Sequence, residues 1–78
     1  MDLVILSPEK EIFKGEVASV KVPGTSGQFE VLSNHAALVS SLKAGEVRLI
    51  DQAGARTTFA ISGGFIEVLN NNVSIAVN

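Results

Sequence analysis

The chain contains one histidine, His35, and no cysteine, so acid–base or metal chemistry would have to combine this imidazole with carboxylates or hydroxyls. A hydrolase needs a nucleophile, a general base and an orienting acid that converge in one pocket. Several serines are present, but the G-x-S-x-G pattern of a nucleophile elbow is absent. His35 is therefore interpreted as a loop histidine that contacts a neighbour, and we expect no catalytic residue.

Metal and phosphate sites also lack the residues that they need. Glu30 is near His35 in the sequence, but no cluster of acidic residues at loop spacing completes a ligand set. The glycines of residues 23–27 are not followed by Gly-Lys-Ser/Thr, so a β-turn explains them better than a phosphate cradle. Those of Ser62-Gly63-Gly64 favour a tight or bulged start of a strand. We expect neither a metal ion nor a cofactor.

The charges are few and dispersed. The net charge is −2, and the six basic residues form no cluster that could neutralise phosphates, which argues against nucleic-acid binding. Glu9 and Glu11 share one face of a strand-like segment, where they would discourage pairing between sheets of different molecules. No stretch approaches the roughly 20 apolar residues of a membrane span. The absence of cysteine is compatible with a reducing compartment such as the cytoplasm.

Glycines and prolines cut the chain into short segments that are rich in valine and isoleucine. Apolar residues alternate with polar ones in several of them, most clearly in residues 16–22, which is the period of a strand with one buried face. Only residues 36–42 are compatible with a helical turn, which would be marginal alone. Strands are predicted at about 2–6, 10–14, 16–23, 28–32, 46–51, 56–61, 64–69 and 72–77.

Such a pattern predicts an all-β domain. Many short strands with no crossover helix imply antiparallel pairing, and two such sheets face to face bury their apolar sides. We expect a small antiparallel β-sandwich or flattened barrel that occupies residues 1–78 as a single domain. Leu38, Val39 and Leu42 have few places to be buried in so small a domain, so they form either a partner interface or one closed end of the sandwich.

Several motifs resemble the epsilon subunit of rotary, F-type ATP synthases. Residues 27–38, Gly-Gln-Phe-Glu-Val-Leu-Ser-Asn-His-Ala-Ala-Leu, are similar to that family's Gly-x-Phe/Leu-x-x-Leu-x-x-His-Ala-Pro-Leu pattern. The segments 7–17, 22–24, 42–48 and 62–68 resemble its opening, its first turn, its Leu-Lys-x-Gly-x-x-Arg segment and its last hairpin. The matches run in order over essentially all 78 residues.

The resemblance implies a β-sandwich of about ten short strands, without the C-terminal helical hairpin of most members. It implies a bacterial, non-catalytic rotor-stalk subunit that links the gamma shaft to the membrane c ring and couples ion flow, such as hydrogen ion transport, to ATP synthesis. The subunit would be peripheral on the cytoplasmic face of the plasma membrane and would touch the membrane only through the c ring.

Site residues follow from the same resemblance, position by position. The positions similar to c-ring contacts are Gln28, Ser33, Asn34 and His35. The positions similar to gamma contacts are Ser7, Leu38, Val39, Ser40 and Leu42.

Two departures and two alternatives accompany this interpretation. Ala37 stands where the family usually has proline, which loosens the loop backbone. The chain stops at Asn78, so it is either a short form of the family or a truncated piece of a longer member, and in both cases inhibition and nucleotide binding by a helical domain are not assigned to these residues. An unrelated β-sandwich that binds peptide or glycan is the first alternative, although tryptophan and tyrosine are absent. An enzyme that uses His35 is the second.

Overall fold

The computed structural model describes all 78 residues and contains only β-strands. Eight strands follow one another along the chain, which confirms the all-β prediction. Their bounds are β1 Asp2–Leu6, β2 Glu11–Gly24, β3 Gly27–Leu32, β4 Leu38–Leu42, β5 Gly45–Asp51, β6 Arg56–Ile61, β7 Gly64–Leu69 and β8 Asn72–Val77. The family-based count of about ten was an approximation to these eight.

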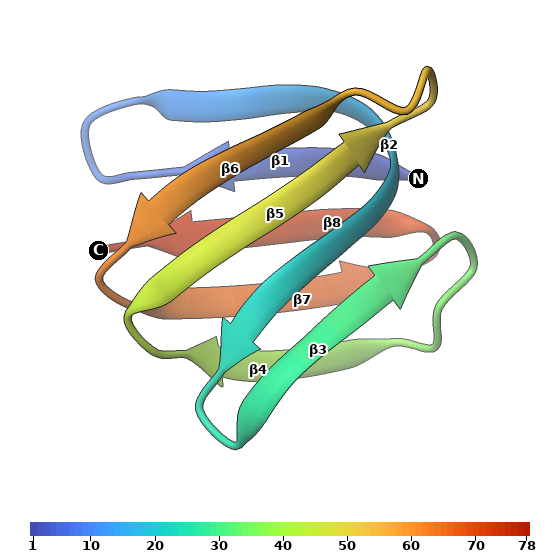
Figure 1. The fold of residues 1–78 in the computed structure, drawn as a ribbon. Coiled ribbons are helices and arrows are strands. Elements are labelled where there is room, and N and C mark those ends of the chain that lie inside the picture. The colour runs from blue at the N-terminus through green and yellow to red at the C-terminus, as the bar shows by residue number, and fades with distance from the viewer.

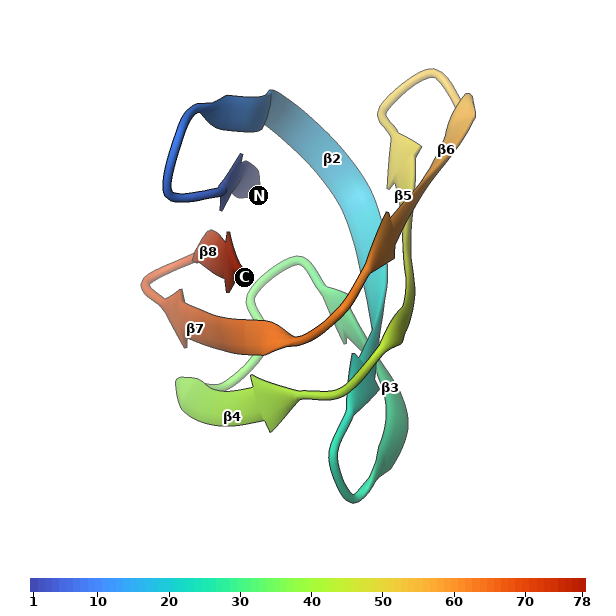
Figure 2. The same ribbon diagram turned by 90° about the vertical axis from the view of Figure 1, so that its left-hand side faces the viewer.

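The strands form two layers that share one strand (Figures 1 and 2). One layer contains β4, β7, β8 and β1 together with the first part of β2. The other contains β3, the second part of β2, β5 and β6. Because β2 pairs with β1 at its beginning and with β3 and β5 further on, the hydrogen bonds run continuously from one layer to the other. The result is the predicted flattened barrel.

Strand β2 corrects the prediction of two strands at residues 10–14 and 16–23. Gly15 does not interrupt it, because β1 continues to pair across this position, with Leu3 opposite Gly15. The register with β5 shifts between Val17 and Ser19, which is the signature of a β-bulge. A bulge of this kind bends a strand and increases its twist, which explains how one strand serves both layers.

The possible helical turn at residues 36–42 is wrong, since Leu38–Leu42 forms strand β4. This strand pairs antiparallel with β7 along its whole length, from Leu38 opposite Val68 to Leu42 opposite Gly64. A five-residue helix could form only one or two internal hydrogen bonds, whereas the partner strand satisfies the backbone of the whole segment. Tertiary pairing therefore decides the structure of this segment.

One strand pair departs from the expected antiparallel arrangement. Strands β1 and β8 run parallel, with Asp2 opposite Asn72 and Leu6 opposite Ala76. The expectation rested on the absence of a crossover helix, but β1 and β8 are not consecutive. The other six strands of the barrel form the long connection that parallel neighbours require.

Fifteen buried apolar side chains lie between the layers and form a single core. They come from every strand except β6, whose Phe59 and Ile61 pack against the cluster from its edge, with Phe59 edge-on to Phe13. The buried residues are Met1, Leu3, Ile5, Val17, Val20, Val22, Val31, Leu42, Val47, Leu49, Ile66, Val68, Val73, Ile75 and Val77.

The glycine-rich segments form tight connections, as predicted. Residues 23–27 are a hairpin turn between β2 and β3, with Gly24 opposite Gly27. Gly63 and Gly64 link β6 to β7 with φ angles of 155° and 152°, in the region that favours glycine. A Cβ atom on Gly64 would overlap the backbone of Ala76 on β8. Only glycine fits where the chain passes from one layer to the other at this point.

Candidate interaction surfaces

The outer side of the layer β1-β8-β7-β4 carries four exposed apolar side chains, which we call the apolar face. Leu6 is 39% exposed, Val39 72%, Phe65 60% and Leu69 53%. Single exposed aliphatic residues are common on soluble proteins, but four on neighbouring strands of one sheet are typical of a protein interface. This face is the leading candidate for a functional surface.

The strand registers place these side chains relative to one another. Leu6 and Phe65 both lie opposite Ala76, so they flank one position of β8. Val39 lies opposite Glu67, one row further along β7. An open hollow of about 720 Å³ reaches the same side of the sheet, where Leu69 and Glu67 belong to its lining together with residues of β1, β2 and β8. The apolar face is therefore interrupted by a carboxylate.

Strand β4 places only one of its four predicted gamma contacts on the apolar face. Val39 points outward, whereas the period of two directs Leu38, Ser40 and Leu42 toward the inside. Leu38 is half-buried against the core, and the hydroxyl of Ser40 donates to the carbonyl of Ser41 at 3.2 Å. Leu42 is 5% exposed and belongs to the core, so of the two interpretations given for these aliphatic residues it fits a closed end of the sandwich and not a partner interface.

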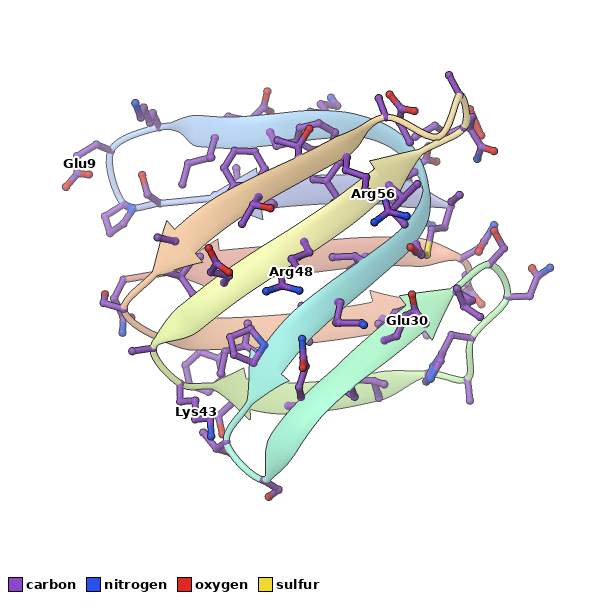
Figure 3. The ribbon with its side chains drawn as sticks, in the orientation of Figure 1. Glu9, Glu30, Lys43, Arg48 and Arg56 are labelled. Atoms are coloured by element: carbon purple, nitrogen blue, oxygen red, sulfur yellow. The ribbon has the colours of Figure 1, made fainter.

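Ser7, the remaining predicted gamma contact, follows Leu6 at the end of the apolar face. It is half-buried in the turn between β1 and β2, where its hydroxyl oxygen accepts a hydrogen bond from the backbone N–H of Lys10 at 3.2 Å. Glu9 lies at the tip of this turn and not on a strand face with Glu11 (Figure 3). Ser7 therefore lies beside Leu6 at the β1 end of the apolar face, with β8 and β7 between it and Val39 on β4.

The four predicted c-ring contacts do not form one patch. Gln28 lies beside the β2–β3 turn, while Ser33, Asn34 and His35 follow the other end of β3 (Figure 1). At about 3.3 Å per residue, Gln28 and Ser33 are about 16 Å apart along the strand direction. Any partner that touches both must reach across one layer of the domain.

Residues 33–37 form the loop between β3 and β4. The backbone N–H of His35 donates to the carbonyl of Leu32 at 3.1 Å, and the N–H of Asn34 donates to Oδ1 of Asn71 at 2.8 Å. The imidazole Nδ1 of His35 lies 2.8 Å from the carbonyl oxygen of Ala36. A carbonyl only accepts, so Nδ1 carries a hydrogen. No carboxylate or hydroxyl is hydrogen-bonded to this imidazole.

The outer side of the other layer, β3-β2-β5-β6, is charged, and we call it the charged face. Glu30, Arg48 and Arg56 lie on it (Figure 3), and Lys21 and Glu46 belong to the same group of residues. Glu30 is opposite Lys21, which in turn is opposite Arg48. These charges line an open hollow of about 320 Å³, and the one salt bridge of the chain joins Arg48 to Glu46 at 3.2 Å with both side chains more than half exposed.

Neither face holds a group of three or more histidine, aspartate or glutamate side chains that could bind a metal ion. The structure contains no helix that is long and apolar enough to span a membrane. The described surfaces are suited to contact with other molecules.

Comparison with known proteins gives the family. The sequence profile of the ATP synthase Delta/Epsilon chain β-sandwich domain matches residues 1–78, which is the whole chain. The chain belongs to this family.

Two relatives of this ATP synthase domain illustrate its range. The ATP synthase epsilon chain of Chlorobaculum tepidum is 48% identical over 69 residues, which cover 88% of this chain and 78% of the relative. That of Protochlamydia amoebophila is 42% identical over 73 residues, which cover 94% of this chain and 50% of the relative. The chain thus spans between half and about four-fifths of these two relatives.

Solved structures agree with the assignment to the ATP synthase family. A chain of the Euglena gracilis mitochondrial ATP synthase, in a structure of OSCP, F1 and c-ring, superposes with a TM-score of 0.91 at 28% identity over 96% of this chain and 48% of its own. A chain of the Tetrahymena thermophila mitochondrial enzyme, with a TM-score of 0.82 at 16% identity over 97% of this chain and 61% of its own, shows the same fold.

Sequence reasoning missed three of the four residues of the apolar face, namely Leu6, Phe65 and Leu69. A signal for two of them was present, because residues 65–69 are apolar on both faces except for Glu67. A strand that is apolar on both sides must bury one side in the core and offer the other to a partner or a second layer.

Proposed function

We propose that this chain is a non-catalytic part of the central rotor stalk of an F-type ATP synthase. In this role it links the gamma shaft to the c ring and couples ion flow to ATP synthesis. The observation that carries the proposal is the apolar face on a domain that belongs to the ATP synthase Delta/Epsilon family. Torque transfer requires a stiff body with adhesive surfaces, and two closely packed sheets provide stiffness.

The gamma subunit is the proposed partner of the apolar face. Val39 and Phe65 are the most exposed apolar side chains of the domain, and aromatic and aliphatic anchors dominate the binding energy of stable interfaces. Ser7 lies at the rim of this face. Leu38 and Ser40 lie on the inner side of β4 and contribute to the gamma interface only by fixing the position of this strand. Leu42 is buried and acts only through the core.

The c ring is the proposed partner of Gln28, Ser33, Asn34 and His35. Their separation at the two ends of β3 favours contacts with polar loops of two different c subunits, since a ring presents repeated loops along its rim. The relatives include bacterial proteins, which supports a location on the cytoplasmic face of the plasma membrane, with the membrane reached only through the c ring.

Reconstitution tests the proposal. The chain is mixed with the gamma subunit and the c ring of its own ATP synthase, and the assembly is separated by size. We expect the chain to migrate with both partners. Migration of the chain alone, under conditions in which gamma and the c ring stay together, contradicts the proposed role.

The variant His35→Ala separates an interface from an enzyme. An interface residue predicts a modest loss of coupling between ATP hydrolysis and ion pumping, with hydrolysis itself nearly unchanged. A general base predicts that turnover falls by about two to four orders of magnitude. Measuring hydrolysis and ion pumping on the same preparation distinguishes the two.

A further inference from the structure

The turn between β7 and β8 contains two residues in left-handed conformation. Asn70 has a φ of 51° and Asn71 a φ of 63°, which are the angles of a two-residue hairpin turn of type I′. Glycine satisfies such a turn as well as asparagine does, because it has no Cβ. The side chain of Asn71 is therefore not needed by the turn itself.

This side chain instead holds a different part of the chain. Oδ1 of Asn71 accepts the backbone N–H of Asn34 at 2.8 Å, across 37 residues of sequence. Asn34 also has a positive φ, of 63°. Outside the strand ladders, the loop of residues 33–37 has one other hydrogen bond to a strand, from His35 to Leu32 at the end of the preceding β3, so this bond alone ties it to a part of the chain that is distant in sequence. We call it the asparagine clasp.

The asparagine clasp lies next to His35, the residue for which a polar contact with the c ring is proposed. His35 follows Asn34, and its imidazole is held against the loop through Nδ1 and the carbonyl of Ala36. Nε2 has no hydrogen-bond partner within the chain and is the atom left for a partner. A loop that is already ordered loses less conformational entropy on binding, so fixing its backbone raises affinity without adding a contact.

We propose that Asn71 is a positioning residue that holds the loop of residues 33–37, and with it His35, in the conformation that meets the partner. The effect on binding rests on the proposed function, since it assumes that this loop is an interface. The clasp itself does not. Ala37, which leaves the loop backbone free at its last position, makes such an external tie more important.

The variant Asn71→Gly tests the clasp, because glycine keeps the φ of the turn and removes only the amide. We expect the Asn34 amide to exchange with solvent about 3 to 10 times faster, which is the effect of losing one ordinary hydrogen bond. We expect the affinity for the assembly of gamma and c ring to fall by a similar factor. The melting temperature should fall by no more than about 8 °C, the shift that the loss of one hydrogen bond causes in a domain of this size.

Two further variants serve as controls. Asn71→Asp keeps an oxygen acceptor at the same place and should restore both slow exchange and affinity. Asn70→Gly changes the same turn without touching the clasp and should resemble the unaltered chain in both measurements.

The outcomes are decisive in each direction. Unchanged exchange at Asn34 in Asn71→Gly overturns the clasp. Faster exchange with unchanged affinity overturns its role in positioning. If the unaltered chain itself does not bind gamma and the c ring, the proposed function fails, while the exchange measurement still decides whether Asn71 holds the loop.

Discussion

The two outer surfaces of this domain differ in the residues that their strands turn away from the core. The layer of β1, β8, β7 and β4 exposes the four large apolar side chains of the apolar face, whereas the layer of β3, β2, β5 and β6 exposes arginine, lysine and glutamate with one large apolar side chain, Leu32. Both layers cover the same core, so the core does not require this difference. Under the proposed function, the layer with the apolar face is the one that a partner covers.

The connection between the two layers is the most sensitive place at which to break this arrangement. In Gly64→Ala the new Cβ must overlap the backbone of Ala76 in addition to the strain of a positive φ. We expect the free energy of unfolding to fall by about 3 kcal/mol or more. Urea denaturation measures it.

Gly54→Ala is the matched control, because Gly54 has a φ of 89° but no neighbour within 4 Å of a Cβ atom. Strain alone predicts a loss of about 1 kcal/mol. Equal losses in the two variants would contradict the argument from close backbone approach.

A second pair of variants compares the two sides of β4. Leu42→Ala removes a core side chain and should lower the free energy of unfolding by about 2 to 5 kcal/mol. Val39→Ala removes an exposed side chain from the same strand and should change it by less than about 0.5 kcal/mol. A large loss of stability in Val39→Ala would mean that the apolar face is part of the fold and not a docking surface.

The third pair of variants compares the faces through binding. Phe65→Asp places a carboxylate in the centre of the apolar face and should weaken binding to gamma at least about 30-fold, as the loss of an aromatic anchor does. Thr58→Asp, opposite Arg48 on the charged face, should leave binding within about twofold. Isothermal titration calorimetry measures the affinity of both variants for gamma. The reverse order of effects would mean that gamma binds to the charged face.

The smallest effect is expected from the salt bridge on the charged face. Arg48→Gln removes the salt bridge to Glu46. Both side chains of this pair are more than half exposed. We expect a change in the free energy of unfolding of less than about 0.5 kcal/mol. A larger loss of stability that persists in 1 M salt would mean that the charged face stabilises the fold by something other than electrostatic attraction.

The sequence predicts most strands of this fold to within one residue. Segments such as 2–6 and 72–77 alternate clearly between apolar and polar residues and are bounded by turn residues, so local chemistry determines them. Strand β4 was missed because its pairing with β7 lies outside any local window. The bulge that unites two predicted strands in β2 likewise depends on neighbours that are distant in the chain.

The interaction surfaces were harder to predict than the fold. Period-two alternation separates two sides of a strand, but it does not say which sides of different strands share a surface. Leu42 was therefore grouped with Val39 although they point to opposite sides of β4. Gln28 and His35 were grouped by motif, and the length of β3 separates them.

The parallel pairing of β1 with β8 affects how the chain folds during its synthesis. Asp2 pairs with Asn72, so the first strand has no neighbour on that side until almost the whole chain has been translated. At about 5 to 20 residues per second, the ribosome needs about 4 to 14 seconds to add the intervening residues. During this time β1 can pair only with β2, and the edge that later pairs with β8 stays open.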